Sequence, residues 1–171
     1  KPMPEPLIEQ LSTVKALLSA YRVPVFEREG YEAEDVLATI AKRIASEQVE
    51  VLLVTGDKDA LQLVNSHIKV YNPHNEDTVL DAAAVKARYG VGPERLVDLM
   101  ALMGDEIDNI PGVPGIGEKT ATQLLSQFGS LERLYDHLEE IPSEARRHAL
   151  AVSRQQVQLS RELAQIDTHV P

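Results

Sequence analysis

Cysteine is absent from the 171 residues, and the chain has no uninterrupted run of about 18 apolar residues. Without cysteine the protein forms neither disulfides nor thiolate metal sites, so oxygen or histidine must hold any metal ion. Near the start, Glu5 and Glu9 interrupt the stretch in which a signal peptide needs continuous apolar residues. We therefore expect a protein of the reducing cytoplasm without a membrane partner.

Positive charge is also scarce, because 17 lysines and arginines stand against 27 aspartates and glutamates, which gives a formal net charge of −10. Nucleic-acid binding normally depends on surplus Lys and Arg, so this sum argues against a phosphate-rich partner. An acidic balance is expected, however, when many carboxylates form one site that works only with divalent cations bound. The positions of the acids therefore matter more than their number.

Apolar periodicity alternates between strand and helix in the first half, where the run Val51–Val54 is the expected central strand. The expected helices there span 6–20, 32–46 and 57–64, and the expected strands span 23–26, 49–55, 68–71 and 78–80. Beyond Asp81 only helices are expected, over 82–89, 93–103, 118–127, 131–138 and one long final segment, 143–166. The sequence predicts an α/β fold with a mostly parallel sheet in residues 1–91, followed by an all-helical subdomain in residues 92–171.

Acidic residues gather at three boundaries between these elements, and each group has a glycine beside it. The groups consist of Glu32, Glu34 and Asp35, then Asp57 and Asp59, then Asp105 and Asp108. Each group alone is also compatible with helix capping or with a solvated loop. Their repetition favours a shared site, since ligands bind beyond the carboxyl ends of strands in open α/β sheets.

Carboxylate oxygens are the ligands that Mg²⁺ and Mn²⁺ prefer, and no cysteine or histidine cluster competes with them here. Two such ions about 4 Å apart bind a scissile phosphate, activate water and stabilise the leaving oxygen. Phosphodiester hydrolysis is the reaction class that this pattern indicates.

Prolines and glycines in residues 110–117 predict a tight hairpin between two helices. A nucleotide-binding P-loop does not fit, because Glu118 separates Gly117 from Lys119 and no strand precedes the loop. The acids also lack the ligand spacing of an EF-hand. A helix-hairpin-helix element fits better, since small residues let DNA approach the backbone and helix-entry N–H groups meet a phosphate. The alternative is a hairpin that merely joins two packed helices.

Three motifs together resemble the 5′ nuclease domain of bacterial DNA polymerase I, within the flap-endonuclease superfamily and its PIN-like core. They are GYEAEDVLA at 30–38, TGDKD at 55–59 and LMGDEIDNIPGVPGIGEKTA at 102–121. The likeness runs from the opening Pro2-Met3-Pro4 to LAQIDT at 163–168, which is nearly the whole chain. It implies a structure-selective nuclease of the bacterial cytoplasm and nucleoid that cuts 5′ flaps and removes RNA primers, with polymerase domains in the full-length protein.

The resemblance also implies roles for individual residues. Glu32, Glu34, Asp35, Asp57 and Asp59 would bind or orient two Mg²⁺ or Mn²⁺ ions, and Asp105 and Asp108 would complete the second ion site. The hairpin would hold duplex DNA, with a K⁺ ion bridging backbone carbonyls to phosphate. The DNA-binding residues implied in this way are Gly112, Val113, Gly115, Ile116, Gly117, Lys119 and Thr120.

Two departures from the family pattern matter. Glu34 stands where polymerase-type members usually have Asp, so its carboxylate would have a different reach. The family's first sheet strands and helical arch, with two further aspartates and basic residues, would precede the first residue of this chain. We therefore expect a fragment that has weak or no activity alone and whose partner is the missing N-terminal portion. The alternatives are a non-catalytic helix-hairpin-helix DNA-binding module and an RNA-cutting relative with the same sheet.

Overall fold

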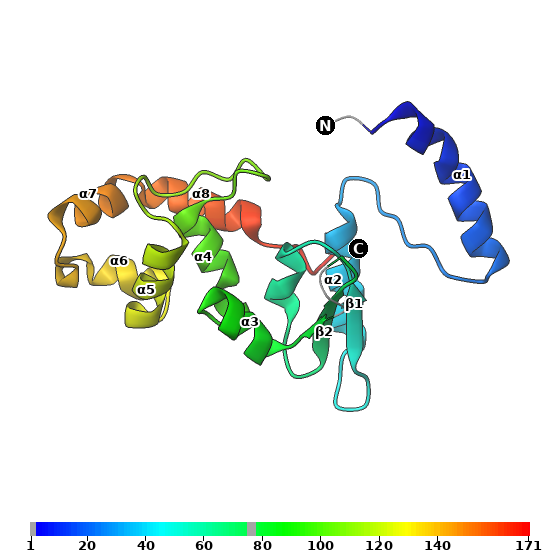
Figure 1. The fold of residues 1–171 in the computed structure, drawn as a ribbon, viewed down its shortest axis with the longest axis horizontal. Helices are drawn as coiled ribbons and strands as arrows, with labels where there is room; N and C mark the ends of the chain where they lie inside the picture. The colour runs from blue at the N-terminus through cyan, green and yellow to red at the C-terminus, as the bar shows by residue number, and fades with distance from the viewer. Residues whose placement is uncertain (1–2, 75–77) are drawn as a thin grey trace.

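The computed structural model describes residues 3–74 and 78–171, so Pro2 of the opening motif lies outside the described residues. Figure 1 shows the sheet and α2 between a group of helices on one side and α1 on the other. The helices are α1 (Glu5–Ala20), α2 (Ala33–Ile44), α3 (Ala82–Tyr89), α4 (Leu96–Met103), α5 (Glu118–Phe128), α6 (Leu131–Asp136), α7 (Glu144–Val152) and α8 (Arg154–Ala164). Short 3₁₀ helices are η1 (Asp59–Leu63), η2 (Pro93–Arg95) and η3 (Leu138–Glu140).

The sheet contains β1 (Val51–Val54), β2 (Ile68–Asn72) and β3 (Thr78–Leu80), in the order β1-β2-β3. β1 runs parallel to β2, and β3 runs antiparallel to it. The expectation of an α/β fold followed by a helical region is confirmed. Within the described residues no helix has the length and apolar content needed to cross a membrane.

Two strand expectations were wrong. β1 is an edge strand rather than a central one, since among the described strands it pairs only with β2. Its Leu53 is 3% exposed, but Leu52 and Val54 are 49% and 61% exposed. The apolar run therefore marks a surface that the described chain leaves uncovered. Residues 23–26 form no strand, because no described segment pairs with them, and a strand needs partners for its N–H and C=O groups.

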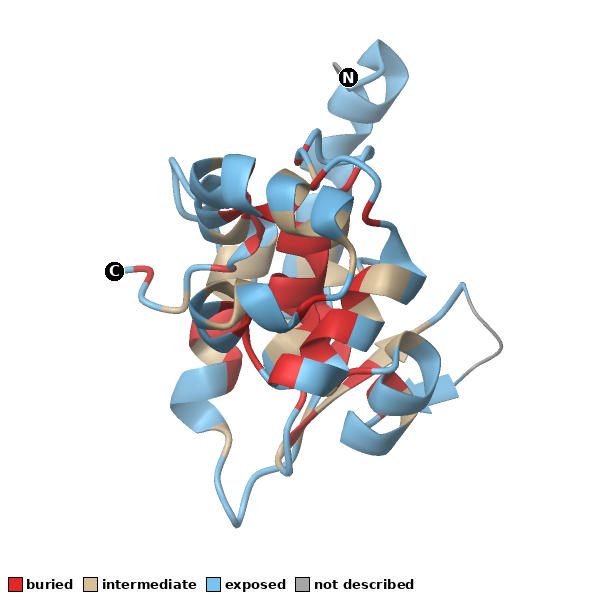
Figure 2. Ribbon diagram, turned by 90° about the vertical axis from the view of Figure 1, so that its left-hand side faces the viewer, coloured by how far each residue is buried: buried red, intermediate tan, exposed pale blue. Residues whose placement is uncertain are grey.

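The core is continuous from the sheet to the last helices, as the buried residues in Figure 2 show. α4 lies at its centre and packs against α5 and α8. Leu99 and Leu102 of this helix are 1% and 0% exposed. Because α4 is held on several sides, the acidic loop that follows Met103 starts from a fixed position.

The expectation of one long final helix was wrong, because the segment forms two helices, α7 and α8. The break is at buried Ser153, which has φ −86° and ψ 3°. Neither glycine nor proline marks this position, so the sequence carries no breaking signal. The change of direction lets α8 pack along α4 while α7 contacts η3.

After α8 the chain returns to α2 as an extended segment, residues 165–171. The Gln62 side chain donates to the Ala164 carbonyl at 3.0 Å and accepts from the Ile166 N–H at 3.1 Å. Further along, the Val170 N–H donates to Thr39 Oγ1 at 3.1 Å. These bonds fix the helical region against the sheet region, and the space between them is where the acidic groups meet.

Candidate metal centre and DNA-binding hairpin

The three acidic groups meet at one cavity of about 460 Å³. Its walls carry every acid expected from the sequence except Asp105, which lies just beside it. The lining residues are Gly30, Glu32, Glu34, Asp35, Asp57, Asp59, Asp108, Ile110 and residues 163–167. The structure therefore brings together groups that are far apart in the sequence.

The first group sits at the start of α2, where an acid also interacts favourably with the helix dipole. Asp35 Oδ2 accepts from the Glu32 N–H at 3.1 Å, which caps the helix. Asp35 Oδ1 accepts from the Asp167 N–H at 2.9 Å. Both oxygens of Asp35 are engaged in this way, and Asp35 lines the cavity together with Glu32 and Glu34.

The second group follows β1. Asp57 Oδ1 accepts from the Asp59 N–H at 2.9 Å, so the two aspartates form a tight local turn. Asp59 Oδ1 is buried and has no hydrogen-bond partner in the structure. Burial, followed by the charges of Asp57 and Asp108, raises the pKa of Asp59 to about 6. A buried, unpaired carboxylate oxygen is the type of atom that a cation would satisfy.

The third group lies on the loop after α4. Asp105 and Ile110 form an antiparallel bridge in which each N–H donates to the other's carbonyl at 2.8 Å. Asp105 Oδ1 accepts from the Ile107 N–H at 3.0 Å, and Oδ2 forms an ion pair with the Lys58 ammonium. Burial alone would raise the pKa of Asp105, but the hydrogen bonds from Lys58 and the backbone outweigh it and lower the pKa.

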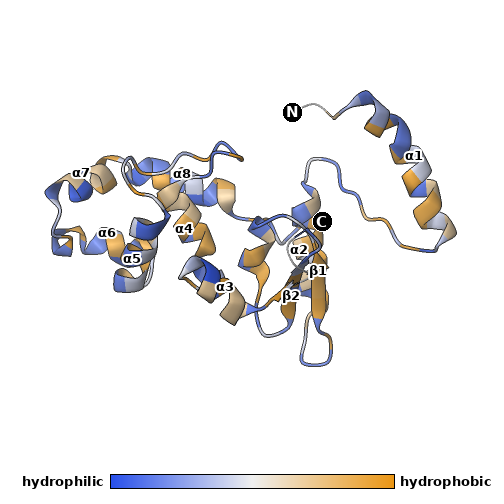
Figure 3. Cartoon of the chain, viewed as in Figure 1, coloured by the Kyte–Doolittle hydropathy of each residue, from blue (hydrophilic) through white to orange (hydrophobic). Residues whose placement is uncertain are grey.

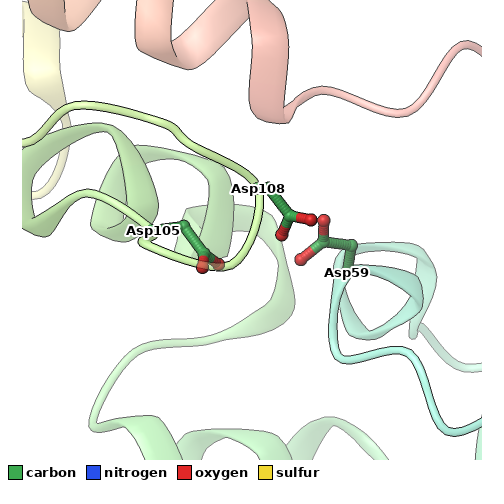
Figure 4. Close-up of side chains that lie close together, drawn as sticks. All are labelled: Asp59, Asp105 and Asp108. Carbon is green, nitrogen blue, oxygen red and sulfur yellow. The ribbon is translucent and has the colours of Figure 1, made fainter. Parts of the chain in front are cut away.

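Asp59, Asp105 and Asp108 each place one carboxylate oxygen within 4.8 Å of the others. In Figure 4, Asp108 and Asp59 extend toward one another from different elements, and Asp105 lies on the same loop as Asp108. Oxygens at this separation suit a hard divalent cation, whose oxygen ligands lie about 2.0–2.6 Å from the ion. The donor set and the unpaired Asp59 oxygen both fit such an ion.

Sequence reasoning assigned no role to Lys58 or to residues 163–167. Lys58 stands between Asp57 and Asp59 in the TGDKD motif, and this position was the sequence signal that could have indicated a role for it. No local signal could have placed Asp167 beside Asp35, because the two residues are 132 positions apart.

Two glycines join the acidic loop to the hairpin. A Cβ atom on Gly112 would lie 2.3 Å from the Met103 carbonyl oxygen, and one on Gly104 would lie 2.5 Å from the Gly112 nitrogen. From α8, Gln156 Nε2 donates to the Gly112 carbonyl at 2.8 Å, and Ser160 Oγ donates to the Pro111 carbonyl at 2.7 Å. The hairpin is therefore positioned by the same elements as the acids.

The seven expected DNA-binding residues occupy different environments. Gly115, Gly117 and Lys119 are exposed, and the added-Cβ positions of both glycines have no atom within 4 Å. Gly112 and Thr120 are partly exposed. Val113 and Ile116 are 3% and 4% exposed, and their N–H groups donate to the carbonyls of Leu102 and Val113. Their side chains thus pack in the core, and their N–H groups already have partners within the protein.

We expect Gly112→Ala to lower the free energy of unfolding by at least about 1–3 kcal/mol, because its methyl group would overlap backbone that cannot move freely. Gly117→Ala is the matched change in the same hairpin. Gly117 has φ −96° and open space around it, so we expect a loss below about 1 kcal/mol. Thermal melts of both proteins check this, and equal melting temperatures would contradict the close packing of Gly112.

Two family models match the chain end to end. Residues 1–90 match "5'-3' exonuclease, N-terminal resolvase-like domain", and residues 91–171 match "5'-3' exonuclease, C-terminal SAM fold". Among curated proteins, the chain is 43% identical over 171 residues to DNA polymerase I of Bacillus caldotenax. This alignment covers 98% of this chain and 20% of that protein. DNA polymerase I of Pseudomonas aeruginosa is 44% identical over 175 residues, an alignment that covers 98% of this chain and 19% of that protein. The chain thus spans about a fifth of the length of these relatives.

Solved structures show the same fold. A flap endonuclease of bacteriophage T5 in complex with DNA and metal ions has a TM-score of 0.80 at 26% identity, covering 94% of this chain and 58% of that chain. The T5 5'-exonuclease with bound zinc has a TM-score of 0.78 at 24% identity, with 98% and 64% covered. The catalytic core of Rad2 with a DNA substrate has a TM-score of 0.63 at 18% identity, with 98% and 59% covered.

Proposed function

The chain belongs to the 5′-3′ exonuclease family, and from this premise we propose that it forms the metal-binding and DNA-holding part of a 5′ nuclease. The proposed reaction is hydrolysis of DNA phosphodiesters with two divalent ions, Mg²⁺ or Mn²⁺. One observation carries the proposal: acids from three separate segments line a single cavity, in which Asp59 Oδ1 is buried without a partner.

We propose a division of labour between the two halves of the sequence. Residues 1–91 supply Glu32, Glu34, Asp57 and Asp59 as ligands, with Asp35 orienting the start of α2. Residues 92–171 supply Asp105 and Asp108. When bound, the ions would supply Lewis-acid polarisation of the scissile phosphate and activation of water. The longer side chain of Glu34 would give its carboxylate a different reach from that of an aspartate at this position.

The hairpin's role in the proposal is to hold the DNA backbone. Gly115 and Gly117 leave room for a phosphate next to the start of α5, where helix N–H groups favour an anion. Lys119 and Thr120 add side-chain contacts, and hairpin carbonyls would hold a K⁺ ion against the phosphate. Such contacts are independent of base sequence, which suits a substrate recognised by shape, such as a 5′ flap, nick or end, with DNA or RNA in the cut strand.

The proposed partner within the same enzyme is an N-terminal portion of the nuclease domain. β1 presents one unpaired edge among the described strands, and Leu52 and Val54 expose apolar surface beside it. α1 has no buried residue, although hydrophobic residues recur along it, as the colouring of Figure 3 shows. Leu7 and Leu17 are 47% and 55% exposed. Additional strands would pair with the open edge of β1, packing of the same portion on the exposed face would cover Leu52 and Val54, and both would bring further acids to the cavity. The polymerase I relatives suggest polymerase domains in the same protein and work at the bacterial nucleoid.

We expect the 171-residue protein alone to cleave a fluorescently labelled 5′-flap substrate weakly or not at all with Mn²⁺. Adding a polypeptide that corresponds to the segment preceding the match in the Bacillus caldotenax relative should restore cleavage, because it completes the sheet and the ligand set. Asp57→Ala serves as the control and should not be restored. Full cleavage by the chain alone would contradict the need for a partner.

The competing hypothesis is a DNA-binding module without catalysis. A measurement of metal binding distinguishes it from the nuclease. A protein that binds duplex DNA but shows no Mn²⁺ binding sensitive to Asp57→Ala or Asp105→Ala would be such a module. Binding of both DNA and Mn²⁺, with the latter lost in these variants, supports the nuclease.

A further inference from the structure

Lys58 places a positive charge among the acids of the proposed metal site. The residue lies between Asp57 and Asp59 in the turn that follows β1. Its ammonium forms an ion pair with Asp105 Oδ2, and the Asp105 side chain is only 4% exposed, against 37% for Lys58. Burial lowers the pKa of Lys58, but the hydrogen bond and charge of Asp105, together with the charges of Asp59 and Asp108, raise it overall.

The two oxygens of Asp105 have different partners. Oδ1 accepts the Ile107 N–H at 3.0 Å, which fixes the carboxylate on its loop. Because Oδ1 is already engaged, a divalent ion that binds Asp105 would compete with Lys58 for Oδ2. Two cations at one buried oxygen repel each other strongly, because the surrounding protein screens charge less than water does.

We propose that Lys58 is an internal counter-ion that occupies Asp105 in the metal-free protein and must leave this oxygen when a divalent ion binds. The inference rests on the proposed function, since it assumes a metal site at Asp59, Asp105 and Asp108. The ammonium is a compact charge with three donors on a flexible stem, so it can both neutralise an acid and move away from it.

Lys58 then has two opposite effects. Without metal it reduces the repulsion between neighbouring carboxylates and so stabilises the folded chain. With metal available it is a competitor, so it weakens divalent-ion affinity. A group that only supported the ligands would do the reverse, because its removal would weaken metal binding.

The test compares Lys58→Met, Lys58→Arg and the matched control Lys69→Met in the whole chain. Lys69 pairs with Glu50 at 2.9 Å and has a side chain 31% exposed. Its replacement by Met changes the net charge by the same amount as Lys58→Met, but does not remove a partner of the acids at the cavity. Calorimetric titration with Mn²⁺ should show about tenfold tighter binding for Lys58→Met, equivalent to about 1.4 kcal/mol. Lys58→Arg and Lys69→Met should stay within about twofold of the unchanged protein.

Thermal melts give a second readout that does not depend on catalysis. With EDTA, Lys58→Met should melt below the unchanged protein, and saturating Mn²⁺ should close the gap. Equal or weaker Mn²⁺ binding by Lys58→Met would overturn the inference while leaving the metal site intact. A Lys58→Met protein that stays unfolded even with Mn²⁺ would also overturn it, since the ion should replace the lost charge. Absence of Mn²⁺ binding by the unchanged protein would instead contradict the proposed function itself.

Discussion

Asp59→Asn should weaken Mn²⁺ binding by at least about 100-fold, since groups that only support metal ligands already contribute about 10–100-fold. The substitution keeps the size of the side chain but removes the charge of a buried oxygen that has no other partner. Calorimetric titration of the purified chain measures the change. Asp136→Asn, the same chemical change at an exposed position of α6, should leave Mn²⁺ affinity unaltered.

The same substitution should stabilise the metal-free protein, and the sign follows from the pKa. Asp59 titrates at about 6 when folded and at 3.8 in the reference state, so the unfolded chain loses its proton first as pH rises. Stability therefore falls between these two values, and the carboxylate is unfavourable above pH 6. With EDTA, Asp59→Asn should melt higher than the unchanged protein at pH 7.5 but not below pH 4. Equal melting at pH 7.5 would contradict the raised pKa of Asp59, and unaltered Mn²⁺ affinity would contradict its role as a ligand.

Arg161→Met should lower the free energy of unfolding by about 3 kcal/mol, the lower end of the range for breaking a buried ion pair. Arg161 Nε lies 2.9 Å from Asp98 Oδ1, and the Asp98 side chain is 2% exposed. Arg95, at 3.3 Å from Asp98 Oδ2, remains as a weaker partner. For a chain of this size the loss corresponds to a melting temperature lower by about 6–12 °C.

Because residues 163–167 comprise the end of α8 and the three residues after it, this ion pair also positions one wall of the acidic cavity. Burial raises the pKa of Asp98 and the charge of Arg161 opposes that rise, so the arginine matters most when Asp98 is ionised. The stability loss of Arg161→Met should therefore be largest at neutral pH and shrink as pH falls. Adding Asp98→Leu should recover much of it, since replacing both partners by apolar groups is often neutral. A double variant less stable than Arg161→Met would contradict a pairwise interaction.

The elements that could be predicted from sequence are those whose signals are local. α2 and its acidic first turn follow from helical periodicity next to a glycine, and α5 follows from the glycine hairpin before it. β1 was correctly placed as a strand but wrongly placed at the centre. An apolar run reports that a segment is apolar, whereas the residues that cover it are a property of the rest of the fold.

The acids that line the cavity were named from the sequence, but the contacts among them were not. The three acidic groups could be found because each lies at an element boundary, and their convergence on one cavity depends on the packing of α4 and α8. The Lys58–Asp105 pair and the Asp167–Asp35 hydrogen bond join segments far apart in the chain. The break at Ser153 was equally hidden, since no residue there disfavours a helix strongly.

The most direct test of the shared metal site is paramagnetic broadening by Mn²⁺ in the NMR spectrum of the chain. Broadening falls steeply with distance, so it locates the ion without reference to activity. At substoichiometric Mn²⁺ we expect the amide signals of residues 32–35, 57–59, 105–108 and 163–167 to broaden together, while those of α3 stay sharp. Broadening confined to one of these segments, or centred elsewhere, would contradict the convergence of the acids on a common ion.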